Sequence, residues 1–117
     1  MIGTIIRELK PGKTNNRNSE GAFLKLKNGD LLYAYTRYQD QGWADHAKAD
    51  IYGILSKDDG DSFGEPFLLF TSDSLGADNV MSVSLMRMQN GDLGVFYLQK
   101  HNDRLSCIPW LARSSDE

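Results

Sequence analysis

The densest run of side chains that could do chemistry is Ser-Lys-Asp-Asp-Gly-Asp-Ser-Phe, at residues 56–63. Its carboxylates are spaced like the oxygen ligands of a calcium loop. An EF-hand loop, however, requires a glutamate at its twelfth position, and counting from Asp58 that position holds Leu69. The spacing therefore predicts a structural turn, and we expect neither a metal ion nor another cofactor.

The same run can satisfy its own polar groups. The carboxylate of Asp58 can accept several backbone N–H groups of a tight turn, and Gly60 can take a left-handed conformation at little cost. The hydroxyls of Ser56 and Ser62 can tie the strand ends, and Phe63 can place an aromatic ring between layers of structure. We expect these five residues to stabilise a turn rather than to act on a ligand.

Two landmarks recur along the chain in the same order. Residues 24–31 (Leu-Lys-Leu-Lys-Asn-Gly-Asp-Leu) return at residues 86–93 as Met-Arg-Met-Gln-Asn-Gly-Asp-Leu, 62 positions later. Residues 56–59 return at residues 114–117 as Ser-Ser-Asp-Glu, 58 positions later. A repeat with a variable loop between its landmarks is typical of a fold built from like units.

Each repeat has the pattern of antiparallel strands. Asn28-Gly29 and Asn90-Gly91 lie between alternating apolar residues and predict hairpins with type I′ turns, in which both turn residues have positive φ. No window has the apolar spacing of an amphipathic helix. The expected strands are residues 4–9, 22–27, 31–38, 50–56, 67–70, 80–88, 93–99 and 108–113.

These elements predict an all-β fold. Four antiparallel strands in a unit of about 60 residues suit one blade of a β-propeller, which closes with about 4–8 blades. Residues 20–71 would form one blade and residues 78–117 most of a second, within a single domain. The chain is therefore expected to be the N-terminal part of a partial β-propeller, with the remaining blades of the same propeller as its partner.

The run at residues 56–63 fits the pattern S-x-D-x-G-x-S/T-W/F and resembles the Asp-box, or BNR repeat, of the sialidase (neuraminidase) superfamily. The order of Arg17, the Asn-Gly-Asp hairpin, Arg37, Asp45 and the Asp-box is similar to the first blade of sialidases. The resemblance extends over nearly the whole chain and implies a divergent, sialidase-like propeller of six blades. In that family Asp-boxes lie at the blade periphery, away from the sugar site.

The resemblance also implies roles for strand-end and loop residues. Planar guanidinium groups bind a carboxylate with two hydrogen bonds, so Arg17 and Arg37 are expected to bind the carboxylate of sialic acid. Asp45 is expected to be the general acid that protonates the leaving oxygen, with Asp50 as the alternative. Sialidases use a Tyr nucleophile with a Glu partner, which come from later blades together with further arginines. The chain alone is therefore expected to be inactive.

Glu20, His46 and Asn79 complete the expected substrate-binding group, since they lie at strand starts or in the loop that holds Asp45. Each also has a structural reading, as a turn, loop or strand residue, and Arg37 equally reads as a solvated strand-end residue. Trp43 lies in the same loop and could stack on a sugar ring. Trp110 is expected in the core.

The leading hypothesis is an exo-sialidase-like glycoside hydrolase acting on terminal sialic acid or a related acidic sugar. Sialidases usually carry Arg-Ile-Pro at the first strand, whereas residues 17–21 here are Arg-Asn-Ser-Glu-Gly, which keeps a uronic acid open as the substrate. The alternative is a non-catalytic, carbohydrate-binding Asp-box propeller, because a fold alone does not define a function.

Composition argues against several other classes. The formal net charge is −3 and the Lys and Arg residues are scattered, so no basic face for nucleic acid is expected. No apolar run approaches the ~20 residues of a membrane helix, and the N-terminus has no signal-peptide pattern, which leaves the localisation open. Cys107 is the only cysteine, which excludes an internal disulfide, and two histidines do not make a metal site.

Overall fold

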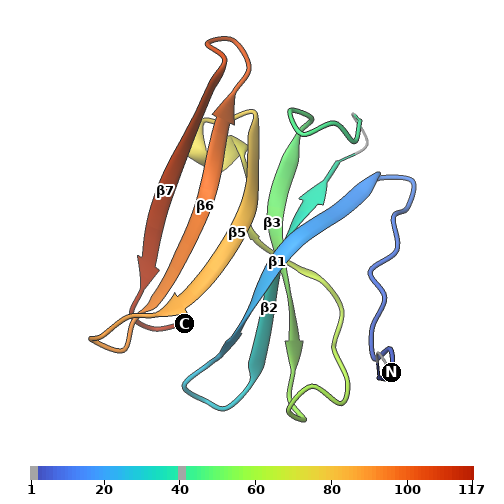
Figure 1. Cartoon of the computed structure of the whole chain (residues 1–117), viewed down its shortest axis with the longest axis vertical. Helices are drawn as coiled ribbons and strands as arrows, with labels where there is room; N and C mark the ends of the chain where they lie inside the picture. The colour runs from blue at the N-terminus through green and yellow to red at the C-terminus, as the bar shows by residue number, and fades with distance from the viewer. Residues whose placement is uncertain (1–2, 40–41) are drawn as a thin grey trace.

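The computed structural model describes residues 3–39 and 42–117. These residues form seven β-strands in two antiparallel sheets (Figure 1). Within the described residues there is no α-helix, and no helix is long and apolar enough to cross a membrane. The predicted all-β fold is confirmed at this level, as two antiparallel sheets.

Both sheets are meanders, in which each strand pairs with the next strand along the chain. The first sheet contains β1 (Arg17–Lys25), β2 (Leu31–Tyr38), β3 (Ala49–Ser56) and β4 (Phe67–Phe70). The second sheet contains β5 (Asn79–Arg87), β6 (Leu93–His101) and β7 (Ser106–Ser114). A 3-10 turn, η1 (Asp73–Leu75), leads into β5.

The two sheets pack face to face, with β5 against the first sheet and next to β1 (Figure 1). Phe70 of β4 packs on Tyr97 of β6, with ring centroids 5.1 Å apart. The backbone N–H of Ser82 donates to the buried Thr36 hydroxyl across the interface, at 3.1 Å. The buried apolar side chains between the sheets are Ala34, Ile51, Ala77, Val80, Val83 and Tyr97. This core fixes the relative position of the two sheets.

Both predicted hairpins are present, but the prediction of type I′ turns is wrong. In the first turn positive φ is confined to Gly29, at 94°. Leu26 N donates to Asp30 O at 2.8 Å, and Gly29 N donates to Leu26 O at 3.0 Å, so the loop has three residues and ends in a left-handed glycine. The Asn28 side chain accepts from Asp30 N at 2.9 Å, which favours this longer loop. The turn at residues 88–92 repeats the same bonds.

Two further expectations are wrong. Residues 4–9 form no strand; they lie against the first sheet, where Arg7 donates to Glu65 at 3.4 Å. Ile5 and Ile6 are adjacent, so their side chains do not form one apolar face that could pack on a partner. They are 85% and 50% exposed. Trp110, expected in the core, is 48% exposed because β7 is the edge strand of its sheet.

Candidate functional site

Residues 56–63, called the octapeptide turn below, form a closed network of hydrogen bonds after β3. Asp58 accepts the hydroxyls of Ser56, at 2.7 Å, and Ser62, and also the backbone N–H of Ser62 at 2.9 Å. The Ser56 hydroxyl oxygen accepts the N–H of Gly60 at 2.8 Å. The Asp58 carboxylate thus accepts one backbone N–H from a following residue, whereas several were expected, because the two serine hydroxyls occupy its other acceptor sites. These bonds, led by that of the Ser62 hydroxyl, lower the pKa of Asp58 to about 2.

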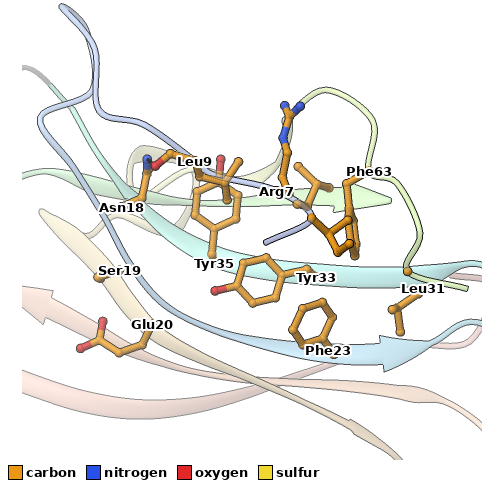
Figure 2. A pocket seen from close by; sticks show the side chains of 13 residues that line it. Arg7, Leu9, Asn18, Ser19, Glu20, Phe23, Leu31, Tyr33, Tyr35 and Phe63 are labelled. Carbon is orange, nitrogen blue, oxygen red and sulfur yellow. Dashed lines mark hydrogen bonds between the residues drawn. The ribbon is translucent and has the colours of Figure 1, made fainter. Parts of the chain in front are cut away.

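The side chain of Phe63 anchors the octapeptide turn on the face of the first sheet that points away from the second. Its ring lies 6.2 Å from that of Phe23, and Figure 2 shows both rings on the same face as Tyr33 and Tyr35. Phe63 was expected between layers, but no described sheet covers this face. A pocket of about 680 Å³ lies here, and Glu20 is the one predicted binding residue that lines it.

The second copy of the motif begins the same turn. Ser114 Oγ donates to Asp116 Oδ1 at 3.0 Å, which repeats the serine–aspartate bond of the octapeptide turn. Glu117 occupies the repeat position of Asp59, and the two residues have φ angles of 55° and 58°. The repeat seen in the sequence is therefore matched by backbone and side-chain geometry.

Asp45 and the octapeptide turn lie at opposite ends of the first sheet. Strand β3 begins at Ala49, next to the loop that holds Asp45, and ends at Ser56, where the turn starts (Figure 1). A strand of this length spans roughly 23 Å at ~3.3 Å per residue. Arg17 begins β1 at the same end as Asp45. Asp58 is therefore far from every other predicted site residue at that end.

Arg17 and Asp45 form an ion pair. Arg17 Nη1 donates to Asp45 Oδ1 at 2.7 Å and to the carbonyl of Trp43 at 3.0 Å, while the guanidinium lies 4.5 Å from the centre of the Tyr38 ring. The hydrogen bond raises the pKa of Arg17 and lowers the pKa of Asp45. Asp45 is thus ionised at neutral pH, whereas a general acid must be protonated before it can donate.

Three consecutive carbonyls of the loop that holds Asp45 accept hydrogen bonds from the second sheet. The Lys100 side chain donates to the carbonyl of Asp45 at 2.7 Å. The Asn102 side chain donates to that of His46 at 3.1 Å, and the Asn79 side chain to that of Ala47 at 2.6 Å. Asn79 is fully buried, so it holds the loop and does not line an open pocket. His46 borders a separate cavity of about 380 Å³, together with Asp73 and Asp78.

Sequence reasoning missed Lys100 and Asn102 as residues that hold this loop. Their contacts join positions 55 and 56 residues apart, at the end of β6 and just beyond it. No motif or spacing marks them, since a lysine and an asparagine at a strand end are ordinary solvated residues. Only the packing of the second sheet on the first brings them to the loop.

Arg37 lies on the opposite face of the first sheet from Arg17. Arg17 is the register partner of Tyr38, and successive residues of a strand point to opposite faces. The Arg37 guanidinium sits 4.5 Å from the centre of the Tyr52 ring. It lines a pocket of about 260 Å³ with Thr14, Gln39, Asp50 and Tyr52. The structure therefore does not bring the two arginines together around one carboxylate.

Asp50, the alternative acid, is a structural carboxylate. It is 4% exposed and accepts the backbone N–H of Ser72 at 2.8 Å and the Ser72 hydroxyl at 3.1 Å. Its other oxygen accepts from Gln39 Nε2 at 2.6 Å. Two hydrogen bonds hold it to the loop before η1 and a third holds it to Gln39 after β2, so it is not positioned to deliver a proton to a ligand.

Glu20 is the extra residue of a β-bulge in β1. Ser19 pairs with Thr36 and Gly21 pairs with the neighbouring Tyr35, which leaves Glu20 without a register partner. Bulges re-aim side chains and occur near functional sites. Glu20 is exposed and lies close enough to Arg17 to raise the pKa of that guanidinium.

Asp78, His101 and Asp103 place one ligand atom each within 4.8 Å of one another, an arrangement that could hold a metal ion. Gln99 opposes this use. Its Nε2 donates to the Leu75 carbonyl at 2.9 Å and lies 3.3 Å from His101 Nε2, so that ring nitrogen must accept a hydrogen bond. A metal on Nε2 would displace this bond, and a metal on Nδ1 would leave an N–H facing the amide N–H.

No protein-family model and no curated protein matches the chain.

Proposed function

We propose that the two sheets are adjacent blades of a sialidase-like β-propeller, part of an exo-sialidase-like glycoside hydrolase that binds sialic acid or a related acidic sugar at the Arg17 end. The observation that carries the proposal is the octapeptide turn, which has the Asp-box pattern and recurs at residues 114–117. Both copies lie away from Arg17 and Asp45, as Asp-boxes lie away from the sugar site in the resembling family.

The sheet arrangement supports a propeller. Each sheet is a meander, and the first strands β1 and β5 lie side by side, as the innermost strands of neighbouring blades do. The outward faces keep large apolar side chains exposed, among them Phe23 at 57% and Met86 at 51%. Further blades of the same propeller would cover these faces.

Side chains at the Arg17 end support recognition of an acidic sugar. Arg17 offers a guanidinium, the group best suited to a carboxylate. Trp43 is 74% exposed in the adjoining loop and can stack on a sugar ring. His46 is exposed in the loop that holds Asp45 and can bind hydroxyl groups, whereas Glu20 lines the pocket on the other face of the sheet.

Non-catalytic carbohydrate binding is the second candidate, and two observations favour it. Arg17 lowers the pKa of Asp45, which opposes proton donation. Arg37 faces away from Arg17, so a carboxylate on Arg17 would not also meet Arg37. Both functions predict binding of an acidic sugar by the chain, and they differ only in turnover.

Binding can be tested by nuclear magnetic resonance on the isotope-labelled 117-residue chain. N-acetylneuraminic acid and glucuronic acid should shift the signals of Arg17 and of residues 43–47, while neutral N-acetylglucosamine should not. Arg17→Gln should abolish these shifts. Arg7→Gln, which removes an arginine whose ion pair is with the exposed Glu65, is the matched control and should leave them unchanged. Absence of shifts, or shifts confined to the octapeptide turn, would contradict the proposed site.

A further inference from the structure

We propose that Asp45 holds the place of a ligand carboxylate on Arg17, so that an acidic ligand binds by exchanging its own carboxylate for that of Asp45. The inference rests on the proposed function for the identity of the ligand as a sugar. The exchange itself requires only a carboxylate.

The geometry of the ion pair makes Asp45 a replaceable partner. Asp45 contacts Arg17 through one nitrogen, Nη1, which also donates to the Trp43 carbonyl. A carboxylate that used two guanidinium nitrogens would gain a second charge-assisted hydrogen bond. The Asp45 side chain is 68% exposed, so it can move into water when it is displaced.

The backbone around Asp45 does not have to move with the side chain. Lys100 holds the carbonyl of Asp45 at 2.7 Å, and Asn79 holds the carbonyl of Ala47 at 2.6 Å. Rotation about the Asp45 side-chain bonds breaks neither contact. The guanidinium of Arg17 also stays in place, because it remains over the Tyr38 ring and bonded to the Trp43 carbonyl.

Exchange would change the charge around Asp45. Arg17, from β1, is the main cause of the lowered pKa of Asp45, with smaller contributions from Lys100 of β6 and from His46 of the same loop. Glu20 and Tyr38 face the Arg17 side of the pair. Loss of the Arg17 contact would move the pKa of Asp45 back toward its ordinary range. A bound acidic sugar would thus bring Asp45 nearer to the protonated form that a general acid needs.

The test compares carboxylate binding in three proteins: the unmodified chain, Asp45→Asn and Asp59→Asn. Asp59 forms another exposed ion pair, with Lys25 at 2.9 Å, at the far end of the sheet, so its variant makes the same change in net charge. Sodium acetate is titrated at pH 7 while the Arg17 Nε–H signal is followed, and glucuronic acid and N-acetylneuraminic acid are titrated in parallel. Circular dichroism checks that each variant folds.

Asp45→Asn should bind acetate about threefold more tightly than the unmodified chain, as expected when an exposed ion pair is removed, and Asp59→Asn should not. Equal affinities in all three proteins, equal gains in both variants, or no response of Arg17 to acetate in any protein would overturn the exchange. A gain for acetate without binding of either sugar would support the exchange and reject the proposed sugar function. Asp45→Ala repeats the comparison without an amide that can still bond to Arg17.

Discussion

Glu20 and Ser82 lie 62 residues apart, which is the period of the first repeat landmark, and each lies in a β-bulge of the first strand of its sheet. Ser82 has a positive φ of 55°, and its N–H donates to the Thr36 hydroxyl of the other sheet at 3.1 Å. The bulge is therefore a property of the repeat. In both sheets it places a polar residue at the same point of the first strand.

Gly21, which follows the bulge in β1, should not tolerate a side chain. A Cβ there would lie 2.3 Å from the Ala34 carbonyl oxygen and 2.6 Å from the Tyr33 ring. We expect Gly21→Ala to lower the free energy of unfolding by about 1–3 kcal/mol, the usual cost of overpacking. Urea denaturation measures this. Gly12→Ala is the matched control, since nothing lies within 4 Å of its Cβ position, and equal stabilities of the two variants would show that β1 is free to adjust.

Asp58→Ala should lower the thermal midpoint by a few degrees and leave the Arg17 end unchanged. The substitution removes the acceptor of two hydroxyls and one backbone N–H in the octapeptide turn. Differential scanning calorimetry gives the midpoint, and the carboxylate titration of Arg17 gives the second readout. Asp61→Ala, in the same turn, is the control. Loss of carboxylate binding in an Asp58→Ala protein that remains folded would contradict a purely structural role.

Acid should destabilise the chain partly through Asp58. Its pKa is about 2 in the folded protein against an ordinary value of 3.8, so its contribution to stability is present above about pH 4 and is lost as the pH falls toward 2. Asp58→Asn should flatten this part of the stability profile measured in urea. The profile should not become level, because the pKa values of Asp45 and Glu117 are also lowered. An unchanged slope in the variant would contradict the assignment.

Sequence reasoning succeeded where the determining interactions are local. The hairpin at Asn28-Gly29 and the octapeptide turn at residues 56–63 are stabilised by groups two to four residues apart, which a motif can record. The turn type was missed because the Asn28 side chain, rather than the Lys27 carbonyl that a type I′ turn would use, accepts from the Asp30 N–H. The bulge at Glu20 was missed because it depends on pairing with β2.

The candidate site was less accessible to sequence reasoning, because its contacts are long-range. Arg17 and Asp45 were both singled out, but their ion pair joins residues 28 positions apart, and no spacing rule indicates it. The burial of Asn79 depends on how the second sheet packs on the loop of the first. Arg37 reads as a strand-end arginine in the sequence, and only the register with β1 shows which face it occupies.

Asn79→Ala should loosen the loop that holds Asp45. Asn79 is fully buried, and the substitution would leave the Ala47 carbonyl without its 2.6 Å donor. The loss of a buried hydrogen bond should cost about 1–3 kcal/mol. Amide hydrogen exchange of residues 43–48 should accelerate more than that of the strands. Asn102→Ala removes an exposed donor to the neighbouring carbonyl and should have a smaller effect. Equal amide hydrogen-exchange rates of residues 43–48 in the two variants would contradict the idea that the buried Asn79 side chain holds the loop.

The purified 117-residue chain should not release the fluorophore from a fluorogenic sialoside. The resembling family uses a tyrosine nucleophile, and Tyr38, which lies beneath Arg17, is fully buried, with its hydroxyl 3.7 Å from the Met81 sulfur. Burial raises the pKa of Tyr38, which disfavours the phenolate. Arg17 lowers the pKa of Asp45 in the free chain, which opposes proton donation to the leaving oxygen. The assay should cover pH 4–7 and include Asp45→Asn, with an active sialidase as positive control. Turnover that disappears in Asp45→Asn would contradict this prediction and would show that the two sheets suffice for catalysis.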